Sequence, residues 1–280
     1  MKKIPLVSNP NVLSIAGSDP SAGAGIQADI KTICALGGYA CTAITALTVQ
    51  NTQGVRSINP VNADLLLQQC EAIFEDIDIA SVKIGMLPNE ESVEIVAGVL
   101  KKYNPSFVVW DPVMESTSGN SLVTSDITDI LLNELLPLVH VVTPNLHELA
   151  QLTSSKEAAL TDEGKVEAQC HALLNRGAKV VLAKGGHFKG NEAVDWLFAE
   201  GLEQRYVKPR IDTENTHGSG CTLSSAIACL RPQLPNITET VAAAKNYTQT
   251  AIEDAKNWKL GKGRGPLSHF NSAAYLFSAA

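Results

Sequence analysis

The chain has 280 residues, of which 45% are apolar, and a formal net charge of -7. This length and apolar fraction are enough to bury the core of one large α/β domain. The acidic balance provides no basic surface for a nucleic-acid backbone, and no stretch approaches the roughly 18 consecutive apolar residues that span a bilayer. We therefore expect a protein that binds neither nucleic acid nor membrane.

Short β-branched segments alternate along the chain with longer amphipathic segments. The predicted strands are Val12–Ala16, Tyr39–Val49, Ile79–Ile84, Phe107–Trp110, His140–Val142 and Lys179–Ala183. The predicted helices between them are Ile26–Leu36, Ala63–Glu75, Glu90–Lys101, Ser125–Leu136 and Asp162–Asn175. This alternation is typical of parallel βαβ units, and the nearly continuous apolar strands indicate a sheet that helices cover on both faces. Such sheets bind ligands at the carboxyl ends of their strands.

The last third of the chain departs from this alternation. Val194–Ala199 and Glu203–Lys208, joined by a turn, predict an antiparallel hairpin at one edge of the sheet. The predicted helices Cys221–Leu230 and Ile237–Trp258 follow the hairpin. No Pro/Ser-rich linker or internal repeat divides the chain. We expect one domain over residues 12–271, a flexible extension over residues 1–11 and a tail over residues 272–280.

The six cysteines lack the C-x-x-C spacing of zinc and redox sites. Such usage fits a reducing cytoplasm. Five of the cysteines are interpreted as small core residues. Cys221 is the exception, because it lies in a glycine-rich motif.

That motif is the strongest local signal in the chain. Asn215–Cys221 has the sequence NTHGSGC and opens an apolar helix. The glycines let the backbone approach a ligand closely, and the first N–H groups of the helix meet it with the positive end of the helix dipole behind them. Gly218, Ser219 and Gly220 therefore predict an anion site. An ordinary glycine-rich loop before a helix explains the motif about as well when it is considered alone.

Cys221 follows these residues at the helix N-terminus, where the pKa of a thiol is depressed. We expect a partial thiolate that accepts the proton of a substrate alcohol. Phosphoryl transfer has a loose transition state in which positioning and charge neutralisation dominate. Loss of Cys221 should therefore reduce activity less than disruption of the anion site.

A second glycine-rich segment, Gly23–Ala28, matches the dinucleotide fingerprint G-x-G-x-x-A after a strand. The acidic residue that would bind the ribose is missing, because no Asp or Glu occurs between Asp29 and Asp64. The sequence also has no Walker A segment. A dinucleotide-dependent enzyme and a P-loop kinase are both disfavoured.

Charged side chains follow three of the predicted strands. Asp111 comes directly after Phe107–Trp110, and Glu148 follows shortly after His140–Val142. Two carboxylates beside a phosphate site suit a magnesium ion that is held mainly through waters. Lys184 ends another strand, where its ammonium can contact nucleotide phosphates. Considered singly, each acid is better explained as a helix N-cap or a surface residue, and Lys184 as a surface lysine.

Taken together, these segments resemble the hydroxymethylpyrimidine and phosphomethylpyrimidine kinase family of thiamin biosynthesis, within the ribokinase-like superfamily. The resemblance runs from about Val12 to Phe270, and the order and spacing of its motifs are highly specific. The matching motifs are Ala16–Ser21, Gly23–Asp29, Gln50–Thr52, Lys83–Met86, Asp111–Met114, Thr143–Asn145 with Glu148, Lys184–His187 and Asn215–Cys221.

The resemblance implies a ribokinase-like three-layer α/β/α sandwich, with a mostly parallel central sheet and an antiparallel edge hairpin, assembled as a homodimer. It implies an ATP- and magnesium-dependent kinase that phosphorylates 4-amino-5-hydroxymethyl-2-methylpyrimidine and then its monophosphate. The implied pyrimidine contacts are Gly17, Asp29, Gln50, Met86, Val113 and Cys221. The implied nucleotide and magnesium positions are Asp111, Asn145, Glu148, Lys184, Thr216 and the backbone of Gly218–Gly220.

The chemistry of that substrate suits the implied contacts. Its ring carries an amine beside a ring nitrogen, and the carboxamide of Gln50 presents an acceptor and a donor at a matching separation. Met86 and Val113 can sandwich the flat ring. Without the resemblance, a strand-end amide that bonds to the backbone explains Gln50 equally well.

Two positions depart from the family pattern. Thr117 stands where many relatives have a lysine, and Asn120 stands where many have an aspartate. If that lysine holds phosphate, the second phosphorylation is weaker in this chain.

Two other functions remain open. A pyridoxine or pyridoxal kinase would use the same kind of pocket, although many such kinases have an aspartate at the position of Cys221. A non-catalytic pyrimidine-binding regulatory protein would keep the fold, but it would not need Lys184, Asp111, Glu148 and Cys221 together.

Overall fold

The computed structural model describes residues 8–115, 122, 126–155, 162–186 and 190–270. Among these residues one nine-stranded sheet has the order β3-β2-β1-β4-β5-β6-β7-β8-β9. Strands β2, β1, β4, β5, β6 and β7 are parallel, and β3, β8 and β9 are antiparallel at the two edges. The strands are β1 Asn11–Ser18, β2 Tyr39–Asn51, β3 Gly54–Pro60, β4 Ser81–Ile84, β5 Val108–Trp110, β6 Val141–Val142, β7 Val180–Lys184, β8 Glu192–Ala199 and β9 Leu202–Pro209.

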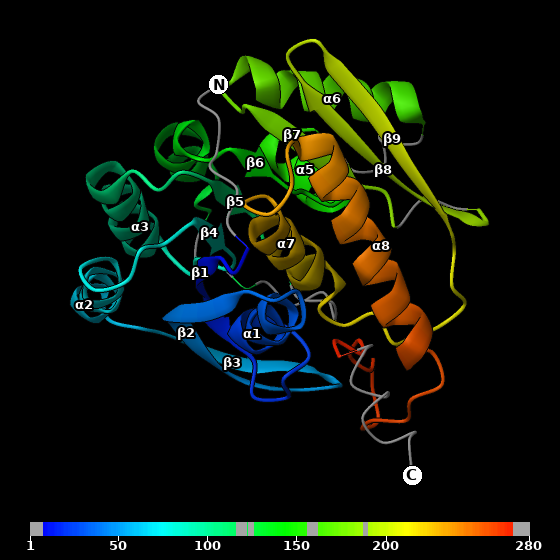
Figure 1. Cartoon of the computed structure of the whole chain (residues 1–280), viewed down its shortest axis with the longest axis horizontal. Coiled ribbons are helices and arrows are strands. Elements are labelled where there is room, and N and C mark those ends of the chain that lie inside the picture. The colour runs from blue at the N-terminus through cyan, green and yellow to red at the C-terminus, as the bar shows by residue number, and fades with distance from the viewer. Residues whose placement is uncertain (1–7, 116–121, 123–125, 156–161, 187–189, 271–280) are drawn as a thin grey trace.

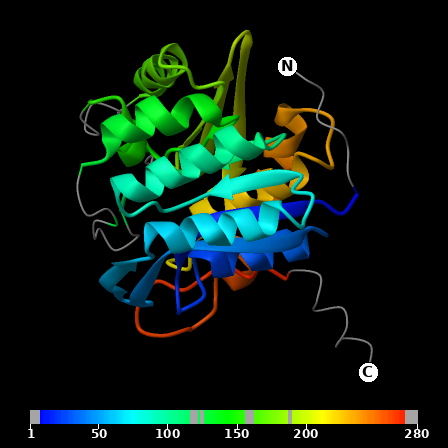
Figure 2. The same cartoon turned by 90° about the vertical axis from the view of Figure 1, so that its left-hand side faces the viewer.

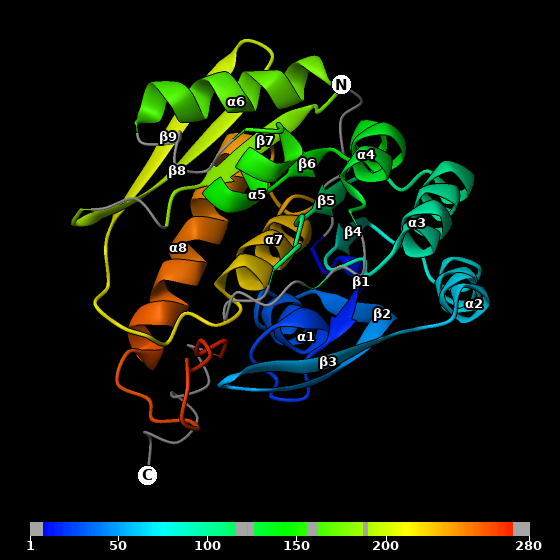
Figure 3. The same ribbon diagram turned by 180° about the vertical axis from the view of Figure 1, so that it is seen from behind.

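Helices cover both faces of this sheet. Helices α1, α7 and α8 lie on the face toward the viewer in Figure 1, whereas Figure 3 shows α2, α3, α5 and α6 on the opposite face. Figure 2 views the molecule from the side on which α2 and α3 lie. The helices are α1 Gly25–Ala35, α2 Ala63–Phe74, α3 Glu90–Tyr103, α4 Thr128–Ile130, α5 Leu146–Leu152, α6 Glu163–Asn175, α7 Ser219–Leu230 and α8 Ile237–Ala255. The predicted three-layer α/β/α architecture is confirmed.

The sheet is buried on both sides, and its inner strands are mostly apolar, with Ser14 of β1 and Ser81 and Lys83 of β4 as buried polar exceptions. In β5, Val108 and Trp110 pack into the core beneath α2, α3 and α6, whereas Val109 packs into the core beneath α7 and α8. Because helices cover both faces of these strands, a ligand cannot reach the middle of the sheet. Polar groups must therefore gather where the strands end.

The predicted alternation of strands and helices is confirmed, with different end points. Strand β3 and helix α5 were not predicted, since β3 has no buried alternating face and α5 is only seven residues long. The predicted helix Ser125–Leu136 is wrong in extent. Its described part consists of α4, a π-helical turn at Leu131–Leu135 and a 3-10 turn at Leu136–Leu138. Pro137 in that last turn lacks the N–H that would continue a helix.

The predicted helix Ile237–Trp258 ends earlier, at Ala255, and the side chain of Asn215 binds carbonyl groups at its carboxyl end. The Asn215 side-chain nitrogen donates to the carbonyl oxygens of Ala255 at 2.7 Å and Trp258 at 2.9 Å. Helix ends leave such carbonyls without intrahelical donors. The start of the predicted anion motif is therefore tied to the end of α8.

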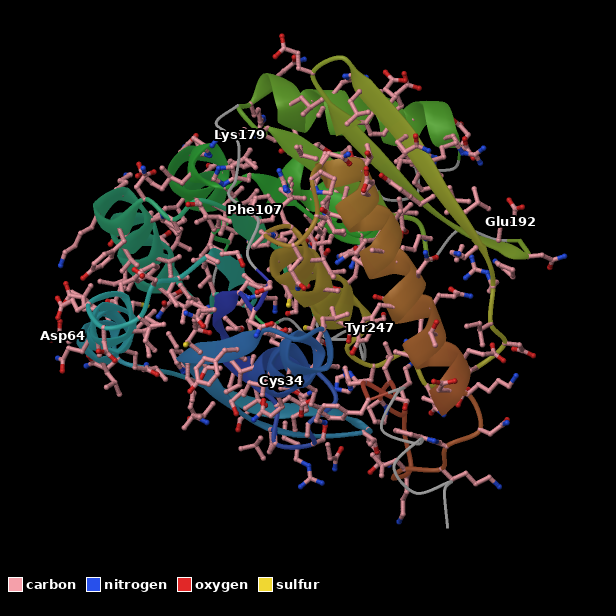
Figure 4. All side chains as sticks on the ribbon, in the orientation of Figure 1. Cys34, Asp64, Phe107, Lys179, Glu192 and Tyr247 are labelled. Atoms are coloured by element: carbon pink, nitrogen blue, oxygen red, sulfur yellow. The ribbon has the colours of Figure 1, made fainter. Side chains whose placement is uncertain are left out.

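All six cysteines are free, as predicted, and four of the five interpreted as core residues are buried. Cys34 is the exception, because it is exposed on α1, where Figure 4 labels it. No helix in the described ranges is long and apolar enough to cross a membrane.

Candidate active site

A cleft of about 720 Å³ opens where the parallel strands end. Its walls come from the segments that follow β1, β2, β4, β5, β6 and β7 and from the start of α7. Every candidate site residue from the sequence except Asp29 lines this cleft. These residues are Gly17, Gln50, Met86, Val113, Asp111, Asn145, Glu148, Lys184, Thr216, Gly218, Ser219, Gly220 and Cys221.

The N-terminus of α7 supplies backbone donors to the cleft. Its N-cap is Gly218, whose φ of 82° is left-handed, and a Cβ at this position would collide with the carbonyl oxygen of Gly23. Only glycine meets both demands. The amide of Ser219 donates to Thr216 O at 3.2 Å, whereas the amides of Gly220 and Cys221 have no backbone acceptor in the described part of the chain. The predicted anion site is thereby corrected, because the Ser219 amide is already used within the turn.

Lys184 lies between the two candidate metal-binding acids. Its Nζ is 2.6 Å from Asp111 Oδ1 and 3.6 Å from Glu148 Oε2. A Cβ added to Gly220 would lie 3.1 Å from the same ammonium, so the start of α7 approaches it closely. Burial would lower the pKa of Lys184, but the two carboxylates outweigh burial and hold the pKa above its ordinary value. The ammonium therefore stays charged.

The two acids have opposite shifts. Burial would raise the pKa of Asp111, but the ammonium groups of Lys184 and Lys83 outweigh it and hold the pKa below its usual range. Burial is also the largest influence on Glu148, and with the charge of Asp111 it raises the pKa to about 7, although Lys184 opposes it. Asp111 is therefore ionised, whereas Glu148 is only partly ionised near neutral pH.

Glu148 is held in place by the helix that it begins. Asn145 is the N-cap of α5, and its side-chain oxygen accepts from the Glu148 amide at 2.9 Å. In return Glu148 Oε2 accepts from the Asn145 amide at 2.7 Å. This reciprocal pair is a capping box. Asn145 and Glu148 therefore both cap helix α5 and line the cleft.

Asp29 does not line the cleft, which corrects the pyrimidine contact implied for it. The residue is fully buried, and its carboxylate accepts from Lys83 at 2.8 Å, from Ser14 at 2.6 Å and from Ser225 at 2.7 Å. Lys83 does reach the cleft wall. Asp29 thus supports a buried ammonium beneath the site.

The expected thiolate at Cys221 is also corrected. Burial raises the pKa of Cys221 to about 11, and neither Lys83 nor an amide hydrogen bond from Gly25 offsets it. The carboxylates of Asp29 and Asp111 add to the rise. A helix N-terminus lowers a thiol pKa only where the dipole outweighs these effects. A thiol with so high a pKa is mostly protonated at neutral pH, which disfavours Cys221 as a proton acceptor.

The opposite wall of the cleft suits a flat ring. Met86 and Leu122 form a buried apolar cluster that Val113 packs against, and Gly17 lies against the Met86 side chain. Gln50 faces the cleft at the end of β2. Apolar surface with one converging amide is typical of sites that bind small heterocycles.

Sequence reasoning gave no role to Asp19, Thr48, Lys83 or His217, which also line the cleft. Asp19, Lys83 and His217 stand in the motifs quoted above, so their position in those motifs was a usable signal. Thr48 had none. Thr117, Asn120 and His187 lie outside the described residues.

Comparisons with known sequences point to one family. A sequence model of the family described as phosphomethylpyrimidine kinase matches residues 19–268. The chain is 45% identical over 262 residues to the hydroxymethylpyrimidine/phosphomethylpyrimidine kinase of Escherichia coli, covering 94% of this chain and 98% of that relative.

Solved structures give the same fold. A phosphomethylpyrimidine kinase from Clostridium difficile matches with a TM-score of 0.76 and 40% identity, over 87% of this chain and 100% of that chain. A pyridoxal kinase from Bacillus subtilis, solved as an ADP complex, matches with a TM-score of 0.85 and 33% identity, over 96% of this chain and 100% of that chain. The predicted ribokinase-like fold is confirmed.

Proposed function

The chain belongs to the phosphomethylpyrimidine kinase family, and from this membership we propose that its cleft phosphorylates 4-amino-5-hydroxymethyl-2-methylpyrimidine with ATP. The monophosphate is then phosphorylated again, to the pyrophosphate used in thiamin biosynthesis. The observation that supports this most directly is the joining of two subsites in one cleft. The wall of Gln50, Met86 and Val113 faces the same space as the amides at the start of α7.

The phosphoryl subsite works by charge and position. The amides of Gly220 and Cys221 provide fixed donors, and the Lys184 ammonium stands beside Gly220. These groups meet the negative charge of the phosphoryl group as it moves to the hydroxymethyl oxygen. Because the Cys221 thiol is protonated, the alcohol loses its proton late and to another acceptor, for example the phosphoryl oxygen itself. Asn145 and Thr216 line the nucleotide side of the cleft in this proposal.

A magnesium ion fits the same region. Asp111 and Glu148 offer carboxylate oxygens on either side of Lys184. Two carboxylates suit an ion that keeps several waters and also binds substrate phosphates. When bound, magnesium would neutralise charge on the nucleotide phosphates. The three-residue acidic and histidine cluster that the described residues do form, Glu167 with His171 and Glu203, lies on α6 and β9 and is not part of the cleft.

The second candidate function is pyridoxine or pyridoxal phosphorylation, because a pyridoxal kinase from Bacillus subtilis has the same fold over 96% of this chain. The cleft wall would accept either flat hydroxymethyl heterocycle. We expect a higher kcat/KM for the aminopyrimidine, and a preference for pyridoxine would reverse the order. The regulatory alternative is disfavoured, since a protein that only binds the pyrimidine would not need Lys184, Asp111 and Glu148 in one charged cluster.

We also propose a cytoplasmic homodimer and a single kinase domain over residues 12–271. Six free cysteines suit a reducing compartment. Leu47 and Val49 leave apolar side chains half-exposed on the edge hairpin of β2 and β3, which is the surface that we assign to the second copy. Sedimentation of the wild-type chain and of Leu47→Asp tests this, and a monomeric wild-type chain would contradict it.

Mass spectrometry of the products from ATP, magnesium and the aminopyrimidine tests the main proposal. The monophosphate and then the pyrophosphate should accumulate. Monophosphate alone would restrict the function to the first step, and no phosphorylated product would reject it.

A further inference from the structure

One nitrogen of His217 lies between two polar side chains in the buried part of the cleft. Its Nε2 is 2.9 Å from Asp19 Oδ2 and 3.3 Å from the terminal nitrogen of the Gln50 side chain. His217 is only 8% exposed, and its ring packs so closely on Gly23 that a Cβ there would collide with it. The ring therefore has a fixed place, and its Nε2 must either donate or accept a proton.

The carboxylate of Asp19 determines whether Nε2 of His217 donates or accepts a hydrogen bond. This carboxylate is 3% exposed and accepts from the amides of Ser21, Gly23 and Ala24 and from the Ser21 hydroxyl. These four donors match an ionised carboxylate before His217 is counted, because a protonated carboxyl group would have to place a hydrogen among them. An ionised carboxylate only accepts hydrogen bonds, and a lone pair facing it in a buried site would be repelled. His217 Nε2 therefore carries a hydrogen.

This hydrogen fixes the direction of the Gln50 carboxamide. That hydrogen is donated to Asp19 at 2.9 Å, but the N–H group still repels the amide hydrogens of Gln50 and attracts the amide oxygen as a second, more distant acceptor. The oxygen and nitrogen of a carboxamide exchange places by a half turn of the last side-chain torsion, with no other movement. The favoured arrangement thus has the oxygen toward His217.

Thr48, at the other end of the Gln50 carboxamide, independently favours the same orientation. In the structure, the Thr48 hydroxyl lies 2.9 Å from the carbonyl oxygen of Ser18 and 3.2 Å from Oε1 of Gln50, so it faces two acceptors. The hydroxyl has one proton, and the Ser18 carbonyl can only accept it. With that proton on Ser18, Thr48 is left as an acceptor, which favours the amide nitrogen of Gln50 in place of Oε1. Both neighbours therefore favour the carboxamide turned by half a turn from the orientation in the structure.

We propose that His217, held by Asp19, is a positioning residue that sets the direction of the Gln50 carboxamide and thereby selects heterocycles with an amine beside a ring nitrogen. The inference rests on the proposed function, in that the ligand is the aminopyrimidine. The remaining lone pair of the Gln50 oxygen accepts from the amine on the His217 side. The remaining N–H donates to the ring nitrogen on the Thr48 side.

A substrate with the reversed pattern tests this selection. In 5-hydroxymethyl-2-methylpyrimidin-4-one, a carbonyl oxygen replaces the amine and the adjacent ring nitrogen carries a hydrogen. The fixed carboxamide would meet it with oxygen against oxygen and N–H against N–H. Each mismatch leaves polar groups unpaired, so the wild-type chain should bind the amine much more tightly than the oxo compound.

The experiment measures dissociation constants of both heterocycles by calorimetry without ATP. His217→Met keeps the volume of the ring and removes the donor, so the preference for the amine should fall by about tenfold or more. His217→Gln keeps an N–H near the position of Nε2 and should retain most of the preference. Thr48→Val removes the partner at the other end and should also reduce it. An unchanged ratio in His217→Met and Thr48→Val would overturn the inference.

The protonation of His217 is a second readout that does not depend on substrate. In ligand-free protein labelled with nitrogen-15 at histidine, NMR should find Nε2 of His217 protonated. A ring protonated only at Nδ1 would overturn the inference, even if the variants fold poorly. If the wild-type chain prefers the aminopyrimidine in binding but does not phosphorylate it, the proposed function is wrong and the inference still holds. If the wild-type chain phosphorylates the aminopyrimidine, but His217→Met and Thr48→Val leave the ratio of the two dissociation constants unchanged, the inference is wrong and the proposed function still holds.

Discussion

The ammonium of Lys83 lies 2.8 Å from Oδ2 of Asp29, and the side chains of both residues are fully buried beneath the cleft. Burying two charges is favourable only when each has its partner. The pair is completed by hydroxyl donors to Asp29 from Ser14 and Ser225. An ion pair between α1 and β4 therefore supports the floor of the cleft.

Lys83→Met should therefore lower the free energy of unfolding by about 3 to 5 kcal/mol, because it leaves the Asp29 carboxylate buried without its countercharge. Urea unfolding measures the change. The matched control is Lys101→Met, which breaks a pair of the same 2.8 Å length with Glu134 on the surface and should cost less than about 1 kcal/mol. Equal costs for the two variants would show that Asp29 is not held as an ionised group.

Cys221→Ala should keep kcat within roughly tenfold of wild type, since a protonated thiol does not supply the factor of about a hundred or more expected of a general base. The pKa of Cys221 is raised to about 11, so the thiol stays neutral between pH 7 and 9. The dependence of kcat/KM on pH in that range should be the same with and without the thiol. A rise toward alkaline pH that disappears in Cys221→Ala would restore the thiolate as proton acceptor.

Glu148→Gln should change how stability depends on pH. The pKa of Glu148 is raised from 4.5 to about 7 in the folded chain, so between these values the folded state binds a proton that the unfolded state has lost. The contribution of Glu148 to stability is present below pH 4.5 and is lost as pH rises through about 7.

Because the amide introduced by Glu148→Gln stays neutral at every pH, the variant should gain stability relative to wild type by about 1 to 3 kcal/mol between pH 5 and pH 8. Urea midpoints at the two pH values measure this gain in the absence of nucleotide and magnesium. The matched control is Glu163→Gln, which changes a half-exposed acid on α6 and should show no such gain. A parallel pH dependence in Glu148→Gln and wild type would contradict the shift.

The residues that could be predicted from the sequence are those that follow strands. Asp111 and Lys184 stand at the ends of apolar β-branched segments, and parallel strands bring their carboxyl ends to one edge of a sheet. Position in the chain therefore predicted that both residues would lie at this edge. Gln50 was implied by the family resemblance, and the start of α7 was predicted from its glycine-rich motif rather than from a strand end.

The residues that could not be predicted depend on contacts between distant segments. Asp19 and His217 are 198 positions apart, and no local pattern indicates that their side chains meet. The motif containing Asp29 was predicted, but its burial depends on Lys83 and Ser225 from two other elements. The thiol of Cys221 was predicted from the helix dipole alone, whereas burial decides its pKa.

The central claim is that backbone amides at the start of α7 hold the phosphoryl group that is transferred. Gly218→Ala tests it most directly, because a Cβ at Gly218 would push the turn away from Gly23 and displace these amides. Gly37→Ala is the matched control, since Gly37 has nearly the same φ, 81° against 82°, and nothing within 4 Å of an added Cβ. Both variants have the same left-handed backbone strain, of about 1 to 2 kcal/mol.

The decisive measurement is kcat/KM for ATP-dependent phosphorylation of the aminopyrimidine in both folded variants. Gly37→Ala should remain within about twofold of wild type, and Gly218→Ala should lose at least about a hundredfold, as removal of preorganised donors does in other enzymes. A folded Gly218→Ala variant as active as Gly37→Ala would contradict the account.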